Sequence, residues 1–293
     1  MKGRKTVEDR IVDGVNTVLM TLIAIVTLYP FYYILIASFN TGLDTAQGGL
    51  YLFPRQFTLE NYQYFFSKRA WVEAFGITVL RTVVGTIVGI LFTSMVAYGL
   101  AKKDLILRKF YYLFIIVAMN VSGGLITYYV VLRSIHLLNS FWVYIIPSML
   151  SLFFLLIAVS FFQEIPSEMS ESARIDGASE VGIFLRIILP VSMPLLATMC
   201  LFLGAAQWNS WLDSAYFVQN NHLRTLAYRM MEVINQANMP TDSGSAQYTA
   251  QAKVTSFSVQ ATAMIISVFP IVCVYPFVQK HFVQGMMLGS VKG

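Results

Sequence analysis

The residues with the clearest chemical character lie in segment 163–190, which is rich in serine and in carboxylates. Ser167 is placed to cap a short helix, and Glu168 and Glu171 fall in its first turn, where the helix dipole favours negative charge. Gly177 is expected to end this helix, because glycine is a common helix terminator. The segment therefore predicts a short polar helix that ends at a sharp corner.

A second helix is expected after this corner. Ser179 can cap it, and an apolar stripe at positions i, i+3, i+4 and i+7 follows. The stripe consists of Val181, Phe184, Leu185 and Ile188. Pro190 is expected to begin the next helix, because a proline is tolerated in a first turn. Taken alone, these residues would fit a pair of helices resting on lipid headgroups.

Another group of polar and aromatic residues lies within or beside long apolar segments. Their hydroxyls and amides could replace the water that a passing polar solute gives up. These candidates for a solute pathway are Asn120, Ser122, Tyr128, Gln207, Trp208, Asn209 and Asp213. Hydrogen bonds between neighbouring membrane helices would explain the same residues equally well.

The composition indicates that a bilayer is the solvent for the elements that position these residues. Hydrophobic residues make up 57% of the 293-residue chain and charged residues only 12%, whereas a soluble globular protein carries roughly 25% charged residues. The mean hydropathy of +0.64 is the reverse of the pattern of a disordered chain. We therefore predict an all-α membrane protein.

Six intervals without Asp, Glu, Lys or Arg are each at least 20 residues long. A helix of about 20 apolar residues crosses a hydrocarbon core of roughly 30 Å. Continuous apolar runs of this kind do not fit the alternating strands of a membrane barrel. The intervals predict six transmembrane helices, at about 14–39, 77–101, 110–132, 141–163, 187–212 and 257–280.

The apolar intervals offer no means of driving chemistry or active transport. A proton relay needs titratable side chains at membrane depth, and the intervals contain no Asp, Glu, Lys or Arg. No G-x-x-x-x-G-K-[ST] phosphate-binding loop occurs in the sequence. We therefore expect no catalytic residue, no metal ligand and no cofactor on this chain, and any energy source would lie on another subunit.

The distribution of basic residues predicts the orientation. Lysines and arginines gather near the amino terminus and in loop 102–109, and such clusters mark the cytoplasmic side. An even number of spans returns the carboxyl terminus to that side, so both termini and loop 164–186 are expected to be cytoplasmic. Segments 44–81 and 213–253 are expected to face outward.

Two further patterns concern packing. Gly85 and Gly89 form a small-xxx-small pair, which lets helix backbones approach closely. In the long outer segment, approximate helical spacing predicts a helix that lies parallel to the membrane. The residues with this spacing are Leu223, Leu226, Met230 and Ile234.

The motif in the polar loop resembles that of a known family. Glu171-Ser172-Ala173, Asp176-Gly177-Ala178 and Leu189-Pro190 resemble the E-A-A-x-x-D-G-A…P loop of ABC importer permeases, which docks on the ATPase subunit and transmits its closure. Ser172 replaces the first alanine of the motif with another small residue. The resemblance implies that loop 164–189 is a coupling loop on the cytoplasmic side. The implied contacts to the ATPase are Glu168, Glu171, Ser172, Ala173, Asp176, Gly177, Ala178 and Phe184.

Other short sequences resemble the carbohydrate-type permeases related to the maltose importer, among them Tyr29-Pro30, Asn61-Tyr62 and Trp208-Asn209-Ser210-Trp211. Ser122 to Ile126 and Leu137 to Ser140 are similar to the branch that imports complex and acidic oligosaccharides, including alginate. The resemblance implies that residues 1–293 form one permease domain of the cell inner membrane. It also implies a heterodimer with a second permease, an ATPase dimer that holds ATP and Mg, and an extracytoplasmic sugar-binding protein, with no nucleic acid partner.

The outer basic residues could attract an acidic oligosaccharide. They are Arg55, Arg81, Arg133, Arg224 and Arg229. Anchoring of span ends at headgroups would explain these arginines too. A different class of function, an ATP-independent carrier or channel for small polar solutes, also fits the spans. A membrane enzyme is disfavoured, because it would need titratable residues or metal ligands at membrane depth.

Overall fold

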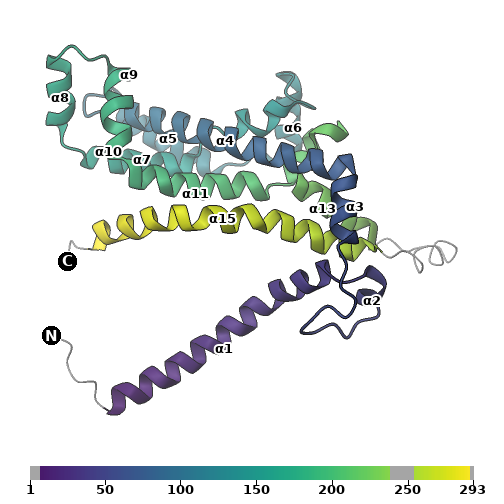
Figure 1. The fold of residues 1–293 in the computed structure, drawn as a ribbon. Coiled ribbons are helices and arrows are strands. Elements are labelled where there is room, and N and C mark those ends of the chain that lie inside the picture. Colours follow the sequence, from purple (N-terminus) through teal and green to yellow (C-terminus); the bar gives the residue numbers. More distant parts are fainter. Residues whose placement is uncertain (1–6, 238–253, 291–293) are drawn as a thin grey trace. The chain divides into compact units, whose positions relative to one another are not determined.

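The computed structural model describes residues 7–237 and 254–290, and the elements within these residues are helical apart from one isolated antiparallel bridge between Asn40 and Phe57 (Figure 1). The predicted all-α class is confirmed. The chain divides into two compact units. Unit 1 combines the chain up to Lys68 with Glu232–Val268, and unit 2 combines Arg69–Met231 with the chain from Phe269 onward.

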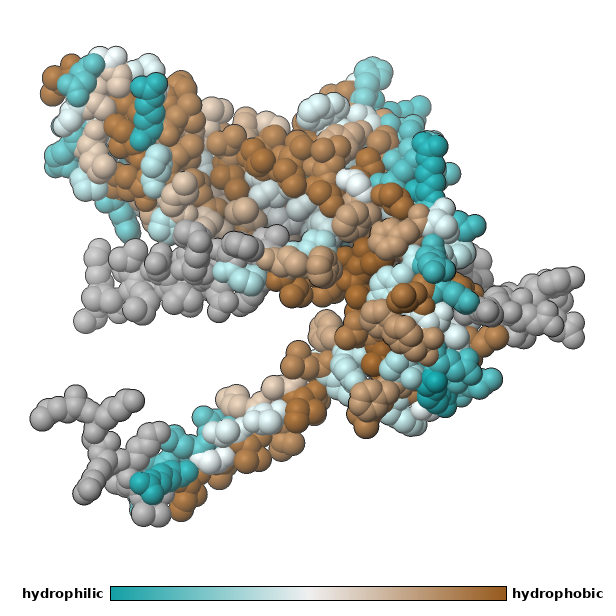
Figure 2. Space-filling view, viewed as in Figure 1, coloured by the Kyte–Doolittle hydropathy of each residue, from teal (hydrophilic) through white to brown (hydrophobic). Residues whose placement is uncertain are grey.

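Unit 1 begins with a long helix, α1 (Val7–Ser38), which starts seven residues before the predicted span. Figure 2 shows apolar side chains along most of this helix, and Leu22 and Phe31 are 58% and 60% exposed. Near its end, Ile36 and Ala37 pack against Ala261. Such a surface needs lipid or another apolar helix around it.

The segment after α1 contains two short helices, α2 (Gly42–Ala46) and α3 (Glu60–Ser67). Buried asparagines organise it. The Asn61 amide donates to the carbonyls of Ser38 and Asn40, and the Asn40 amide donates to Asp44 at 2.8 Å. Asp44 also accepts from Arg55 at 3.0 Å. Hydrogen bonding by Asn40 is the main reason why the pKa of Asp44 lies below its usual value.

Unit 2 is built around α4 (Arg69–Ala101), which packs against α7 (Leu152–Glu164) and α11 (Met193–Asn209). Buried apolar side chains from these helices form its main core. The other elements before the polar loop are α5 (Arg108–Asn120), α6 (Gly124–Ser134), and the short 3-10 helices η1 (Phe141–Tyr144) and η2 (Ile146–Ser148). After α11 come α12 (Leu212–Phe217), η4 (Asn221–Leu223) and α13 (Leu226–Ala237).

Three predicted spans are not single straight helices. Residues 110–132 form α5 and α6, which meet at 115°, and residues 141–163 form η1, η2 and α7 with a bend of 45°. Around 187–212 the bend is 83°, between Glu180–Val191 and Met193–Asn209. Among the described residues, three helices are long and apolar enough to cross a membrane, and three bent pairs are so when each is counted as one span. The number six stays a prediction.

The breaks have local causes. Gly124, at the start of α6, has φ +74°, a left-handed conformation that an ordinary residue avoids. Pro147 lies in η2 and cannot donate a backbone hydrogen bond. Pro194 stands at the beginning of α11, so the new helix starts at Met193. The expectation that Pro190 begins this helix is wrong, since Pro190 lies in the preceding α10 (Leu189–Val191).

The two packing predictions have different outcomes. Leu226, Met230 and Ile234 lie in a helix, α13, as their spacing predicts, whereas Leu223 belongs to the separate η4. That α13 lies parallel to the membrane stays a prediction. A Cβ atom at Gly85 would lie 2.7 Å from Nε2 of Gln207 on α11, and one at Gly89 would lie 3.5 Å from Leu203. The last described helix, α15 (Ser256–Ser290), starts one residue before the predicted span and runs ten residues beyond it.

Replacing Gly85 by alanine should destabilise unit 2, because the new methyl group displaces the buried Gln207 amide from its hydrogen bonds. Overpacking of this kind costs about 1–3 kcal/mol. The thermal unfolding midpoint in detergent should therefore fall. Gly99→Ala, on the same helix, is the matched control. Apart from the helix's own backbone and the neighbouring residues, no atom lies within 4 Å of the Cβ position of Gly99. Equal midpoints for the two variants would contradict the close contact.

Candidate functional site

The predicted coupling loop forms two short helices at one end of unit 2 (Figure 1). The first, α8 (Ser167–Ile175), ends at a corner where Gly177 has φ +79°. The second, α9 (Glu180–Ile183), starts with the Ser179 hydroxyl accepting from the Gly182 amide at 3.2 Å. The glycine corner and the Ser179 cap are therefore confirmed.

The predicted Ser167 cap is wrong. Ser167 is the first helical residue of α8, the cap position belongs to Pro166, and no side-chain hydrogen bond caps this helix. A proline directly before a helix already restricts the backbone at its entrance.

The predicted apolar stripe is only half correct. Phe184 and Ile188 are buried, whereas Val181 and Leu185 are 67% and 50% exposed. The reason is η3 (Phe184–Ile188), a π-helical turn. A π turn closes hydrogen bonds over five residues instead of four, so Ile183 and Ile188 share the buried face.

The residues implied to contact the ATPase fall into two groups. On α8 and the corner, Glu168, Glu171, Ser172, Asp176, Gly177 and Ala178 are exposed, and Ala173 is half-buried against the main core. Phe184 is 5% exposed, and its ring centroid lies 5.5 Å from that of Tyr98 on α4. The first group therefore presents a surface, whereas Phe184 supports the loop from within.

Sequence reasoning missed the carboxylate that ties this loop to α4. Glu180 accepts from Nε of Arg174 at 3.0 Å and from the Tyr98 hydroxyl at 2.9 Å. Nζ of Lys102 lies 2.7 Å from Oε2 of Glu180, the oxygen that also accepts from Tyr98. The hydrogen bond from Lys102 is the largest cause that lowers the pKa of Glu180 to about 2. The carboxylate is therefore charged throughout the physiological pH range.

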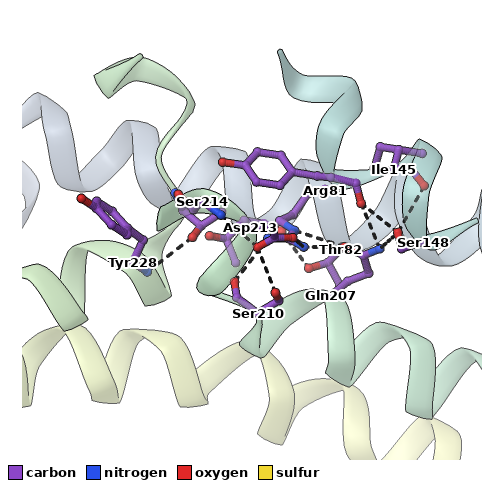
Figure 3. Close-up of polar contacts among 12 residues, drawn as sticks. Arg81, Thr82, Ile145, Ser148, Gln207, Ser210, Asp213, Ser214 and Tyr228 are labelled. Atoms are coloured by element: carbon purple, nitrogen blue, oxygen red, sulfur yellow. Dashed lines mark hydrogen bonds and ion pairs between the residues drawn. The ribbon is translucent and has the colours of Figure 1, made fainter. Parts of the chain in front are cut away.

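A second cluster forms around Arg81 of α4, about three turns from the start of the helix, and Figure 3 shows its polar contacts. Arg81 is 2% exposed, and its Nη2 lies 2.6 Å from Oδ2 of Asp213. The same guanidinium donates to Oε1 of Gln207 at 2.9 and 3.1 Å and lies 4.4 Å from the centre of the Tyr144 ring. The assignment of Arg81 to an exposed basic surface is wrong. Arg81 lies within α4, which begins at Arg69, and its side chain is buried.

This cluster uses the polar groups of two candidate pathway residues. The Gln207 amide donates to Ser148 at 2.7 Å and to the Tyr144 carbonyl at 3.3 Å. Asp213 also accepts from the Ser210 hydroxyl at 2.9 Å. Gln207 and Asp213 therefore hold α4, α11, α12 and the η1–η2 segment together.

The remaining pathway candidates do not join this cluster. Asn120 and Asn209 are exposed and donate to carbonyls one turn earlier in their own helices. Ser122 accepts from the Gly124 amide at the α5–α6 break. Tyr128 meets Phe217 edge-on with ring centroids 5.4 Å apart, and Trp208 is buried. Gln207 and Asp213 are therefore the two pathway candidates that bind Arg81.

Two other arginines that were predicted to face outward also have partners in the structure. Arg55 pairs with Asp44. Arg224 donates to the Ser214 carbonyl and lies 4.2 Å from the centre of the Tyr228 ring. In the part of the chain that the structure describes, no group of three or more His, Cys, Asp or Glu side chains could hold a metal ion.

Asp213→Asn should destabilise the protein strongly, because it leaves the Arg81 cation buried without a counter-charge. Breaking a buried pair from one side costs about 3–5 kcal/mol. The thermal unfolding midpoint should drop far below that of Asp104→Asn, a control at an exposed carboxylate. Removing both charges with Arg81→Met and Asp213→Leu should recover much of the loss. A stable Asp213→Asn protein would contradict the structural role.

Comparison with known proteins agrees with this arrangement. Residues 89–288 match the family described as binding-protein-dependent transport system inner membrane component. Protein LplC of Bacillus subtilis (strain 168) is 36% identical over 98% of this chain and 97% of its own length. The polygalacturonan/rhamnogalacturonan transport system permease protein YtcP of the same organism is 33% identical over 98% of this chain and 100% of its own.

The fold is also known from a solved structure. A bacterial ABC transporter involved in the import of the acidic polysaccharide alginate contains a chain that matches with a TM-score of 0.86. The match covers 96% of this chain and all of that chain, at 24% sequence identity. This likeness concerns the fold. The matched residues 89–288 and the two relatives show that the chain belongs to the family of binding-protein-dependent transport system inner membrane components.

Proposed function

We propose that the chain is the transmembrane permease subunit of an ATP-driven importer for oligosaccharides. The observation that carries the proposal is the exposed helix α8 with its left-handed Gly177 corner in a chain of the binding-protein-dependent family. A helix presented in this way can insert its polar side chains into a groove on another subunit. We propose that this other subunit is an ATPase.

The energy source is proposed to lie outside this chain. In this proposal, an ATPase dimer binds ATP and Mg and closes when ATP is bound. The closure moves α8. A second permease completes a heterodimer, and an extracytoplasmic sugar-binding protein delivers the solute. The proposed orientation has both termini, loop 102–109 and residues 164–189 on the cytoplasmic side, and the basic residues of loop 102–109 support it. Residues 1–293 act as one permease domain.

The proposed mechanism is alternating access without a covalent intermediate. The bent pairs α5–α6 and α10–α11 give the helices interruptions about which rigid segments can turn. Substrate hydroxyls would meet polar groups that the chain leaves exposed, such as those of Asn120 and Asn209. Gln207 and Asp213 are proposed to act through the shape of the bundle, since their polar atoms bind Arg81.

The proposed substrate is an acidic oligosaccharide. The name of the relative YtcP includes polygalacturonan and rhamnogalacturonan, which supports this class of substrate. YtcP is 33% identical over 98% of this chain. The outer arginines give less support, because Arg81 and Arg55 are already paired with carboxylates. The substrate class therefore depends mainly on the relatives.

Gly177→Leu should leave membrane insertion intact and release the ATPase, or uncouple ATP hydrolysis from transport. Leucine is strained at φ +79°, and its side chain would occupy the exposed corner. The measurement is co-purification of the ATPase with the tagged permease, followed by ATP hydrolysis in liposomes. Gly99→Leu, at an exposed and unobstructed position on α4, is the control. Normal ATPase binding and substrate-stimulated hydrolysis in Gly177→Leu would refute docking at α8.

Uronate oligomers should stimulate ATP hydrolysis by the importer reconstituted with its binding protein, and neutral maltodextrins should have little effect. The physical reason is that a binding site for a polyanion is built from charge-assisted hydrogen bonds, which a neutral sugar cannot form. Oligogalacturonates and maltodextrins of equal length provide matched probes. The opposite ranking would remove the acidic substrate and leave the permease function standing.

A further inference from the structure

The carboxylate of Glu180 is a junction between the coupling loop and α4. It receives Arg174 from the end of α8, and it receives Tyr98 and Lys102 from the end of α4. Glu180 itself is the first residue of α9. Three elements therefore meet at one charged group.

The geometry of α8 explains why it needs such a junction. Its two chain connections are an extended turn at Ile165–Pro166 and the corner at Gly177. No atom beyond the neighbouring residues lies within 4 Å of the Cβ position of Gly177. The corner is therefore closed by local backbone hydrogen bonds, from Gly177 to the Arg174 carbonyl and from Ala178 to the Ala173 carbonyl, and Ala173 is the residue of α8 that packs against the main core. Among the ion pairs of the described residues, α8 takes part in one, between Arg174 and Glu180.

The opposite side of the junction is firmly held. The Tyr98 ring packs on Phe184, and Nζ of Lys102 lies 5.3 Å from the centre of the same tyrosine ring. Tyr98 belongs to α4, the long helix that packs on α7 and α11. About 17 residues separate it from Arg81, which is roughly 25 Å along a helix. A displacement of the cytoplasmic end of α4 would therefore reach the Arg81 cluster.

We propose that Glu180 is a positioning residue that makes α8 and the cytoplasmic end of α4 move as one body when the ATPase moves α8. This role rests on the proposed docking of the ATPase at α8. Without the Glu180 carboxylate, α8 turns about the Gly177 corner, and its movement is lost before it reaches α4.

The test measures the distance between spin labels at Ile87 on α4 and Ile175 on α8, which are 53% and 88% exposed. The labelled permease lacks Cys200 and Cys273 and is purified in the full importer, without nucleotide or trapped with ATP and vanadate. The unsubstituted junction should give one narrow distribution that is the same in both states. Glu180→Gln should broaden the distribution and make it shift on trapping, and Glu164→Gln, a carboxylate on the same loop, should not.

Charge reversal provides a second criterion. Glu180→Lys should broaden the distribution further, and adding Lys102→Glu and Arg174→Glu should narrow it again. The thermal unfolding midpoints of the Glu180 variants should stay close to that of Glu164→Gln, because exposed ion pairs contribute little to stability. This separates positioning from a general loss of structure.

A narrow, nucleotide-independent distribution in Glu180→Gln would overturn the proposal, whatever the reversed variants show. Failure of the proposed docking has a different signature, because the ATPase would then remain bound to Gly177→Leu. The label distances in the nucleotide-free importer decide on Glu180 in either case.

Discussion

The buried ion pair between Arg81 and Asp213 is the interaction on which the packing of α4, α11 and α12 depends. A cation at this depth is costly unless its charge and its hydrogen bonds are satisfied. Asp213 supplies the charge and Gln207 the further acceptor, and Gly85 leaves the space that the Gln207 side chain needs. The pair therefore fixes how α4, α11 and α12 approach one another.

The sequence was sufficient for the features that depend on local chemistry. The Gly177 corner and the Ser179 cap follow from single residue types, and the all-α class follows from the apolar composition. The burial of Arg81 was missed, because the arginine was counted with the outer basic residues although it falls within the predicted span 77–101. Only the distant Asp213 makes this arginine acceptable inside a helix, and a pairing across 132 positions leaves no local signal.

Other differences also come from tertiary structure. The π-helical turn at Phe184–Ile188 moves the buried face away from Val181 and Leu185, and a regular helical period cannot anticipate it. The glycines at 123 and 124 explain why the helix breaks between α5 and α6. Nothing in the sequence predicts the angle of this break. The sequence carries no signal for the role of Glu180, because only the folded chain brings Lys102 and Tyr98 to it.

The central claim is that α8 is the surface on which the ATPase binds, and photo-crosslinking tests it most directly. A photoreactive amino acid at Ile175, which is 88% exposed on α8, should crosslink the permease to the ATPase subunit in native membranes. The same probe at Ile126, which is 81% exposed on α6, should not. Crosslinking to the ATPase from Ile126 and none from Ile175 would contradict the account.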